Sequence, residues 1–170
     1  MKTRIIFALL LLFPTAVVLS KSAQQKLDKA AFYEVMDHGN LDDIEKEIDV
    51  VTNSSSPEKE GYVGALMMRK ADKLKLPALR LKAFKAGRMK FDPAMAADPD
   101  NVEFHFLRMA IQEHAPKIVK YNKDIETDKK IVIKGYKSQP PAVQHAIMDY
   151  TRKSKVLAAS DLKLSNQTAL

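Results

Sequence analysis

The chain has 170 residues, a formal net charge of +7 and no cysteine, with 46% hydrophobic but only 7% aromatic residues. This length suffices for one domain with a buried core, and the composition, with five Gly and no Trp, favours helices over a β-sandwich. The lack of cysteine excludes disulfides, thiol catalysis and lipoprotein attachment, which suits a bacterial periplasmic protein better than a small eukaryotic secreted one.

The first 20 residues have the pattern of a secretory signal peptide. Lys2 and Arg4 precede an apolar run from Ile5 to Leu19, and small residues follow it. About 15 apolar residues fall short of the roughly 20 that span a bilayer, so we expect cleavage near Ser20 and not an uncleaved anchor. The mature chain is then expected in the periplasm or outside the cell, without a transmembrane helix.

The first half of the mature chain shows helical periodicity and clear helix ends. Gly39 is expected to end the first helix, Asn40 to cap the second and Ser56 to cap the third. The fourth is expected to begin at Pro77, with the small Gly87 allowing a neighbouring helix to approach closely. The expected helices cover 23–38, 41–51, 57–74 and the residues from 77 onward.

Two Asp-Pro pairs, at 92–93 and 98–99, predict a short irregular or kinked segment before the fifth helix. Asp100 with Glu103 predicts a capping box that opens this helix, over 101–114. Two more helices are expected, over 124–136 and 141–157.

The chain lacks strand alternation and hairpin turns, so the fold class is predicted to be all-α. After the signal peptide (1–20) we expect a single helical domain (21–157) and a flexible tail (158–170). Its six or seven helices should form antiparallel hairpins, as a helical bundle or a short repeat-like stack.

Charge is unevenly distributed along the chain. Residues 21–60 carry five Lys/Arg and ten Asp/Glu, whereas residues 61–95 carry nine and two. The two segments could attract each other or be solvated separately, and the basic one could instead bind nucleic acid or anionic lipid. Export argues against nucleic acid. A second basic stretch, with aromatic residues, spans 117–136 and could be a solvated face or meet a glycan, lipid headgroup or protein.

The fifth predicted helix is apolar around most of its circumference, which indicates a central position between several neighbours. His105, Arg108 and Gln112 form its narrow polar stripe, at i, i+3 and i+7. This stripe could line a groove for a polar or anionic ligand, or it could be a solvated edge. Glu103 falls within the apolar arc, where helix capping explains it and a general base is the alternative.

No pattern in the sequence indicates a catalytic residue, a metal site or a cofactor. The histidines have no metal-binding spacing, the serines have no G-x-S-x-G motif, and the five glycines form no phosphate loop. The paired methionines at 67–68 are typical of core filling.

Two resemblances cover parts of the chain. Gly87, Phe91, Ala94 and Pro99 have the spacing of the second helix of a tetratricopeptide repeat, although the 34-residue period does not continue. GYVGALMMRKAD, NVEFHFLRMAIQEHAP and YNKDIETDK, within 61–136, resemble a group of uncharacterised exported helical proteins of the Bacteroidetes. That resemblance implies compartment and fold and supplies no activity.

These observations favour a non-enzymatic interaction or scaffold protein that binds another envelope or secreted protein. Its partner surface is expected on the fourth and fifth helices, and the candidate residues are Lys85, Arg88, His105, Arg108 and Gln112. The alternative is a small-ligand-binding or catalytic domain that uses the polar stripe.

Overall fold

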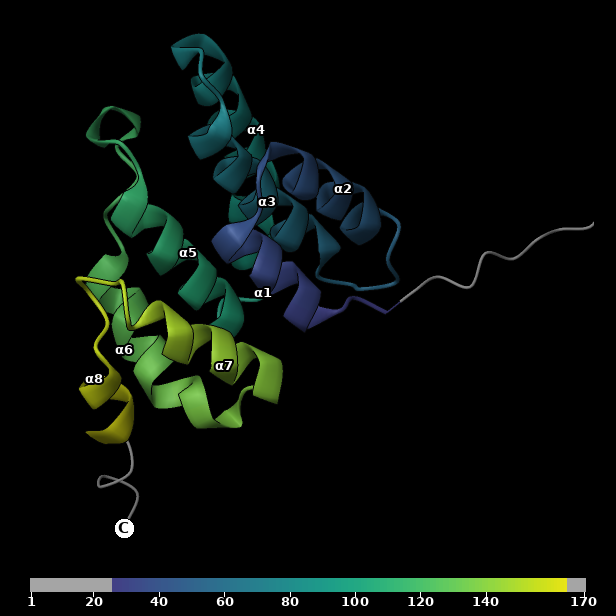
Figure 1. Cartoon of the computed structure of the whole chain (residues 1–170). Coiled ribbons are helices and arrows are strands. Elements are labelled where there is room, and N and C mark those ends of the chain that lie inside the picture. The colour runs from purple at the N-terminus through teal and green to yellow at the C-terminus, as the bar shows by residue number, and fades with distance from the viewer. Residues whose placement is uncertain (1–25, 165–170) are drawn as a thin grey trace, which may run out of the picture.

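The computed structural model describes residues 26–164, which form α-helices, two short 3-10 helices and no strand (Figure 1). The all-α prediction is confirmed. Residues 1–25 and 165–170 lie outside the described part, and so does the expected signal peptide with its cleavage site. No helix within 26–164 is long and apolar enough to cross a membrane. The α-helices are α1 (Lys29–His38), α2 (Leu41–Thr52), α3 (Lys59–Lys73), α4 (Pro77–Ala97), α5 (Val102–His114), α6 (Ile125–Gly135), α7 (Pro141–Tyr150) and α8 (Ala159–Leu164), and the 3-10 helices are η1 (Lys117–Val119) and η2 (Tyr136–Ser138).

Helices α3 and α4 form an antiparallel hairpin whose tip stands above the rest of the molecule in Figure 1. Two glycines set its close packing, as the sequence predicts for Gly87. A Cβ atom at Gly87 would lie 2.6 Å from the carbonyl oxygen of Gly64, and one at Gly64 would lie 2.6 Å from the backbone nitrogen of Phe91. The two helix backbones therefore meet directly.

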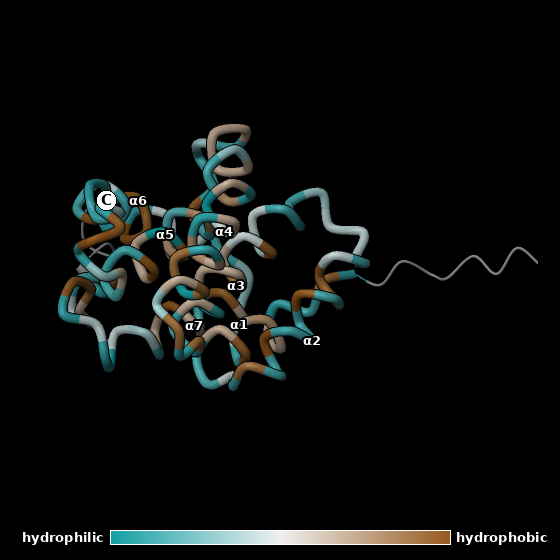
Figure 2. The backbone as a smooth tube through the Cα atoms, turned by 90° about the horizontal axis from the view of Figure 1, so that it is seen from above, coloured by the Kyte–Doolittle hydropathy of each residue, from teal (hydrophilic) through white to brown (hydrophobic). Residues whose placement is uncertain are grey.

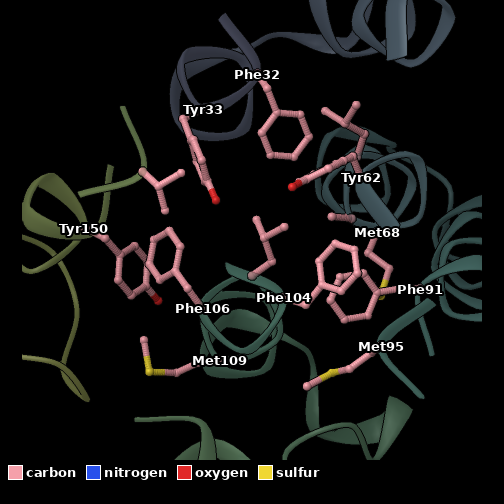
Figure 3. Packing of buried hydrophobic residues seen from close by; sticks show 14 of the residues in the cluster. Phe32, Tyr33, Tyr62, Met68, Phe91, Met95, Phe104, Phe106, Met109 and Tyr150 are labelled. Atoms are coloured by element: carbon pink, nitrogen blue, oxygen red, sulfur yellow. The ribbon is translucent and has the colours of Figure 1, made fainter. Parts of the chain in front are cut away.

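Helix α5 lies at the centre of the core, as its apolar circumference predicts. Figure 3 shows buried side chains around it, and Figure 2 shows apolar segments of α1, α3 and α7 gathered near the middle. Phe104 contacts the rings of Tyr62 and Phe91, with centroids 5.5 Å and 5.7 Å away. On the opposite side, Phe106 contacts the rings of Tyr33 and Tyr150, at 5.8 Å and 5.5 Å. Rings on α5 thus join the hairpin to α1 and α7.

The observed helix caps agree in part with those predicted from the sequence. Asn40 and Asp43 form a capping box at the start of α2, where Asn40 was expected as cap. Helix α1 begins at Lys29, later than predicted. Asp28 caps it, because its carboxylate accepts hydrogen bonds from the backbone N–H groups of Ala30 and Ala31. The third helix also begins later, at Lys59, after a turn in which Ser56 Oγ accepts the Glu58 N–H.

The predicted cap of α5 is wrong by one residue. Asn101, not Asp100, caps the helix, since its side chain accepts the Phe104 N–H at 3.0 Å. Glu103 does not take part in a capping box, because its carboxylate binds side chains of α1.

Of the two alternatives predicted for 92–99, an irregular or a kinked segment, the irregular one is wrong, because α4 continues through Pro93 to Ala97. A proline inside a helix removes one hydrogen bond, here to the carbonyl of Met89. Met89 and Pro93 are both exposed, so water can reach that carbonyl group.

The C-terminal part differs from the prediction as well. Helix α7 ends at Tyr150, and α8 forms where a flexible tail was expected. Leu162 of α8 is 2% exposed, and Asp161 pairs with Lys129 of α6 at 2.9 Å. Burial of one leucine and an ion pair therefore hold this short helix on the domain.

The acidic and basic segments meet at two ion pairs. Lys70 on α3 pairs with Glu45 on α2 at 2.6 Å, and Lys90 on α4 pairs with Glu60 on α3 at 2.6 Å. The remaining cations of 73–85 make no ion pair with a described residue. Attraction between the segments thus explains part of the charge pattern only.

Replacing Gly64 or Gly87 by alanine tests the close packing of the hairpin. In the middle of an ordinary helix, replacing glycine by alanine stabilises the folded protein by about 0.5–1 kcal/mol. Here the added Cβ meets backbone atoms that cannot rotate away, so we expect a loss of about 1–3 kcal/mol in the free energy of unfolding. Urea denaturation measures it, and unchanged or increased stability would contradict this packing.

Candidate functional site

The structure brings His105, Arg108 and Gln112 together on one side of α5, where they face α6. Asp128 of α6 is fully buried between the first two. Arg108 donates from Nε and Nη2 to its two carboxylate oxygens, at 2.7 Å and 2.6 Å. Burial alone would lower the pKa of Arg108, but the hydrogen bonds and charge of Asp128 raise it. This bidentate pair is therefore strongly held.

Both ring nitrogens of His105 are also occupied. Nδ1 lies 2.6 Å from an oxygen of Asp128, and Nε2 lies 2.8 Å from the carbonyl oxygen of Pro99. Both neighbours, the Asp128 carboxylate and the Pro99 carbonyl, are hydrogen-bond acceptors. His105 thus ties α6 to the α4–α5 connection.

Gln112 completes this interface. Its amide donates to the Asp124 carboxylate and accepts the Asp124 backbone N–H, both at 3.2 Å. It thereby satisfies a free N–H group at the start of α6, and its side chain is buried. The stripe predicted as a candidate ligand surface is thus occupied by contacts with α6.

Glu103 holds α1 against α5. Its carboxylate accepts from Lys29 Nζ at 2.7 Å and from the Tyr33 hydroxyl at 2.8 Å. Lys29 also contacts the Tyr62 hydroxyl. Burial, followed by the charge of Glu103, raises the pKa of Tyr33 and of Tyr62 well above their ordinary value, so both stay neutral donors.

The two remaining candidates, Lys85 and Arg88, lie on α4. Arg88 pairs with Asp92 at 3.1 Å and stacks on the Tyr121 ring, 4.5 Å from its centroid. Lys85 is exposed and has no ion-pair partner among the described residues. Neither cation pairs with Asp124 or Asp128 in the described residues, and Arg88 shares its neighbour Tyr121 with Arg108.

A groove of about 500 Å³ lies on another side of α5. It is enclosed by α1, α3, α5 and α7, together with Phe84 of α4. Apolar side chains make up most of its floor. They are Tyr33, Met36, Met68, Phe84, Phe106, Leu107, Ile111 and Tyr150.

Small side chains leave this groove open. Five alanines line it, on α1, α5 and α7 and just after α5, where larger residues would fill the space. They are Ala30, Ala110, Ala115, Ala142 and Ala146. The arrangement is an apolar cleft between helices of the kind that takes small molecules.

The polar residues of the groove are mixed in charge, with more carboxylates than cations. Asp37 pairs with Lys153, and Asp72 pairs with Arg69 at 3.3 Å. Burial lowers the pKa of Lys153. Glu34, by contrast, is exposed and has no ion-pair or hydrogen-bond partner in residues 26–164. The others are His38, His114, His145 and Asp149.

None of the five residues predicted as a surface lines this groove, and sequence reasoning missed it. The sequence contains two helical periodicities that mark residues of the groove. Ala30, Tyr33, Glu34 and Asp37 follow one face of α1, and Ala142, His145, Ala146 and Asp149 follow one face of α7. Each pattern defines a helix face, but neither reveals that the two faces border one cleft.

Within 26–164 no group of three or more His, Asp or Glu side chains could hold a metal ion. Comparisons of the chain with protein-family models, with curated proteins and with solved structures find no match.

Asp128→Asn tests whether the polar stripe is structural. The change leaves Arg108 and His105 without their shared anion, so we expect a loss of roughly 3–5 kcal/mol in the free energy of unfolding. Glu60→Gln, in the exposed pair with Lys90, is the matched control and should cost at most about 1 kcal/mol. Equal stability of the two variants in urea denaturation would show that Asp128 does not hold the helices together.

Proposed function

We propose that the protein is an exported, non-enzymatic binding protein that takes a small amphipathic molecule into the groove on α5. The observation that carries this proposal is the cleft of about 500 Å³ with an apolar floor and polar residues at its edge. Ligand pockets for small molecules fall between roughly 300 and 1,000 Å³ and combine these features. A lining drawn from several helices supports a small molecule over a partner helix, which needs a long groove along one direction.

The charges at the groove support a ligand whose polar end donates hydrogen bonds or is cationic. The cations Lys153 and Arg69 are paired with Asp37 and Asp72. Glu34 is a carboxylate without a partner in the described chain, and it lies on the same α1 face as Tyr33 and Asp37. A ligand amine can therefore meet Glu34 while an apolar body contacts the floor.

Displacement of a fluorescent apolar probe tests this ligand class. We expect N-phenyl-naphthylamine to brighten in the groove, and decylamine to displace it at least about tenfold better than decanoate does. Glu34→Gln should remove most of the preference for the amine, because it removes the unpaired charge. If decylamine and decanoate displace the probe equally well from the wild-type protein, the assignment of the polar end is contradicted.

Filling the groove provides a second test of the same proposal. Ala146→Leu places a larger side chain in the cleft, and we expect at least about tenfold weaker binding of the probe with unchanged stability. Ala96→Leu, at an exposed position of α4 outside the groove, is the matched control and should bind as the wild type does. If both variants bind normally, the probe occupies another site and the proposal fails.

Export is the other part of the proposal, and its support is the basic and apolar pattern of residues 1–20. Mass spectrometry of the protein from envelope and culture fractions should find a mature N-terminus near Ser20. Recovery of the chain only in the cytosol, with Met1 and the apolar run intact, would contradict this part and leave the groove test unaffected.

A further inference from the structure

Exposed leucines mark the start of α4, at the tip of the α3–α4 hairpin. Leu76 and Leu79 are 62% and 45% exposed, whereas the later Phe84 and Phe91 are buried. Another exposed apolar residue, Ile118 of η1, is 88% exposed. Water-facing apolar groups of this size, on the hairpin tip and on η1, suggest a surface that meets an apolar phase.

The same two turns are basic. Every charged residue between 73 and 91 is Lys or Arg, and so is every charged residue between 115 and 123. Near the leucines, none of the cations forms an ion pair with a described residue. These cations are Lys73, Lys75, Arg80, Lys82 and Lys85.

The acidic residues closest in sequence are already paired. Asp72 binds Arg69 at 3.3 Å. Asp92 binds Arg88 at 3.1 Å and accepts the Tyr121 hydroxyl at 2.8 Å. The positive charge of the two turns is therefore not neutralised from within the fold.

Tyr121 ties the segment that contains η1 to the middle of α4. Its ring contacts Phe84 of α4 with centroids 5.6 Å apart, and it packs under the guanidinium of Arg88. Lys120, just after η1, has a left-handed backbone (φ 48°) that reverses the chain toward this contact. In Figure 1 the hairpin tip and η1 both project toward the upper end of the molecule.

We propose that this basic apolar tip, residues 73–82 with 117–120, docks the protein on the surface of an anionic lipid bilayer. Leu76, Leu79 and Ile118 enter the interfacial region, and the surrounding lysines contact lipid phosphates. Apolar insertion combined with attraction to anionic lipid is the physical basis of peripheral binding. The tip is an attachment to the surface only, and its action does not depend on the groove.

An anionic bilayer fits this surface better than an acidic protein does. The exposed apolar side chains stand on two separate turns among flexible lysines, and a fluid interface adapts to such separate points. A protein partner would need a matching pocket for each of them.

Sedimentation with phospholipid vesicles tests the proposal on the full mature chain. We expect binding to vesicles of equal parts phosphatidylglycerol and phosphatidylcholine, at least tenfold weaker binding to pure phosphatidylcholine, and loss of binding at high salt. Wild-type protein that stays in the supernatant with both vesicles would overturn the proposal, as would capture by an acidic protein alone.

Two sets of variants locate the contact. Leu76→Ser with Leu79→Ser and Ile118→Ser should weaken vesicle binding at least tenfold, and so should Lys75→Gln with Lys82→Gln and Lys117→Gln. Their controls replace exposed apolar or lysine side chains elsewhere, two residues for the apolar set and three for the lysine set. These controls are Val50→Ser with Met89→Ser, and Lys130→Gln with Lys134→Gln and Lys137→Gln.

All changed residues are exposed, so the variants should keep the wild-type melting temperature, and circular dichroism checks this. Equal vesicle binding by the tip variants and their controls would overturn the assignment. Ala146→Leu, which fills the groove, should bind vesicles normally, so failure of one proposal is distinguishable from failure of the other.

Discussion

One carboxylate, Asp128, neutralises the polar side of α5 and fixes α6 against it. Helix α5 is apolar around most of its surface, so its few polar groups must find partners inside the fold. Arg108 and His105 find them in Asp128, and Gln112 finds them in Asp124. This leaves another side of α5 free to form the floor of the groove.

The groove and the basic apolar tip adjoin at one residue. Phe84 lines the groove, and its ring also packs against Tyr121, which holds η1 beside the hairpin. A protein that rests on a lipid surface by its tip would present the neighbouring groove close to that surface. The two proposals concern separate surfaces, yet together they describe a binding protein for amphipathic molecules near a membrane.

The sequence predicts much of the fold because helix faces and ends depend on nearby residues. The central position of α5, the close approach at Gly87 and the cap at Asn40 all follow from local spacing. Local rules fail where two solutions are close in energy, as with Asp100 and Asn101 as caps of α5. The partner of the polar stripe could not be predicted, since Asp128 lies on another helix and spacing within α5 does not specify which helix faces it. Alanine fits any helix, so the alanines of the groove gave no indication of a cleft.

The central claim is that two sides of α5 have different roles. One side packs against α6, and another forms the floor of a groove that binds a ligand. Methyl NMR of the folded protein, titrated with decylamine, measures this directly. We expect the methyl groups of Ala110, Ile111 and Ala146 to shift with a common saturation curve, while those of Val132 and Ile133 on α6 stay in place. Shifts confined to α6, or no saturable shift at the groove, would contradict the account.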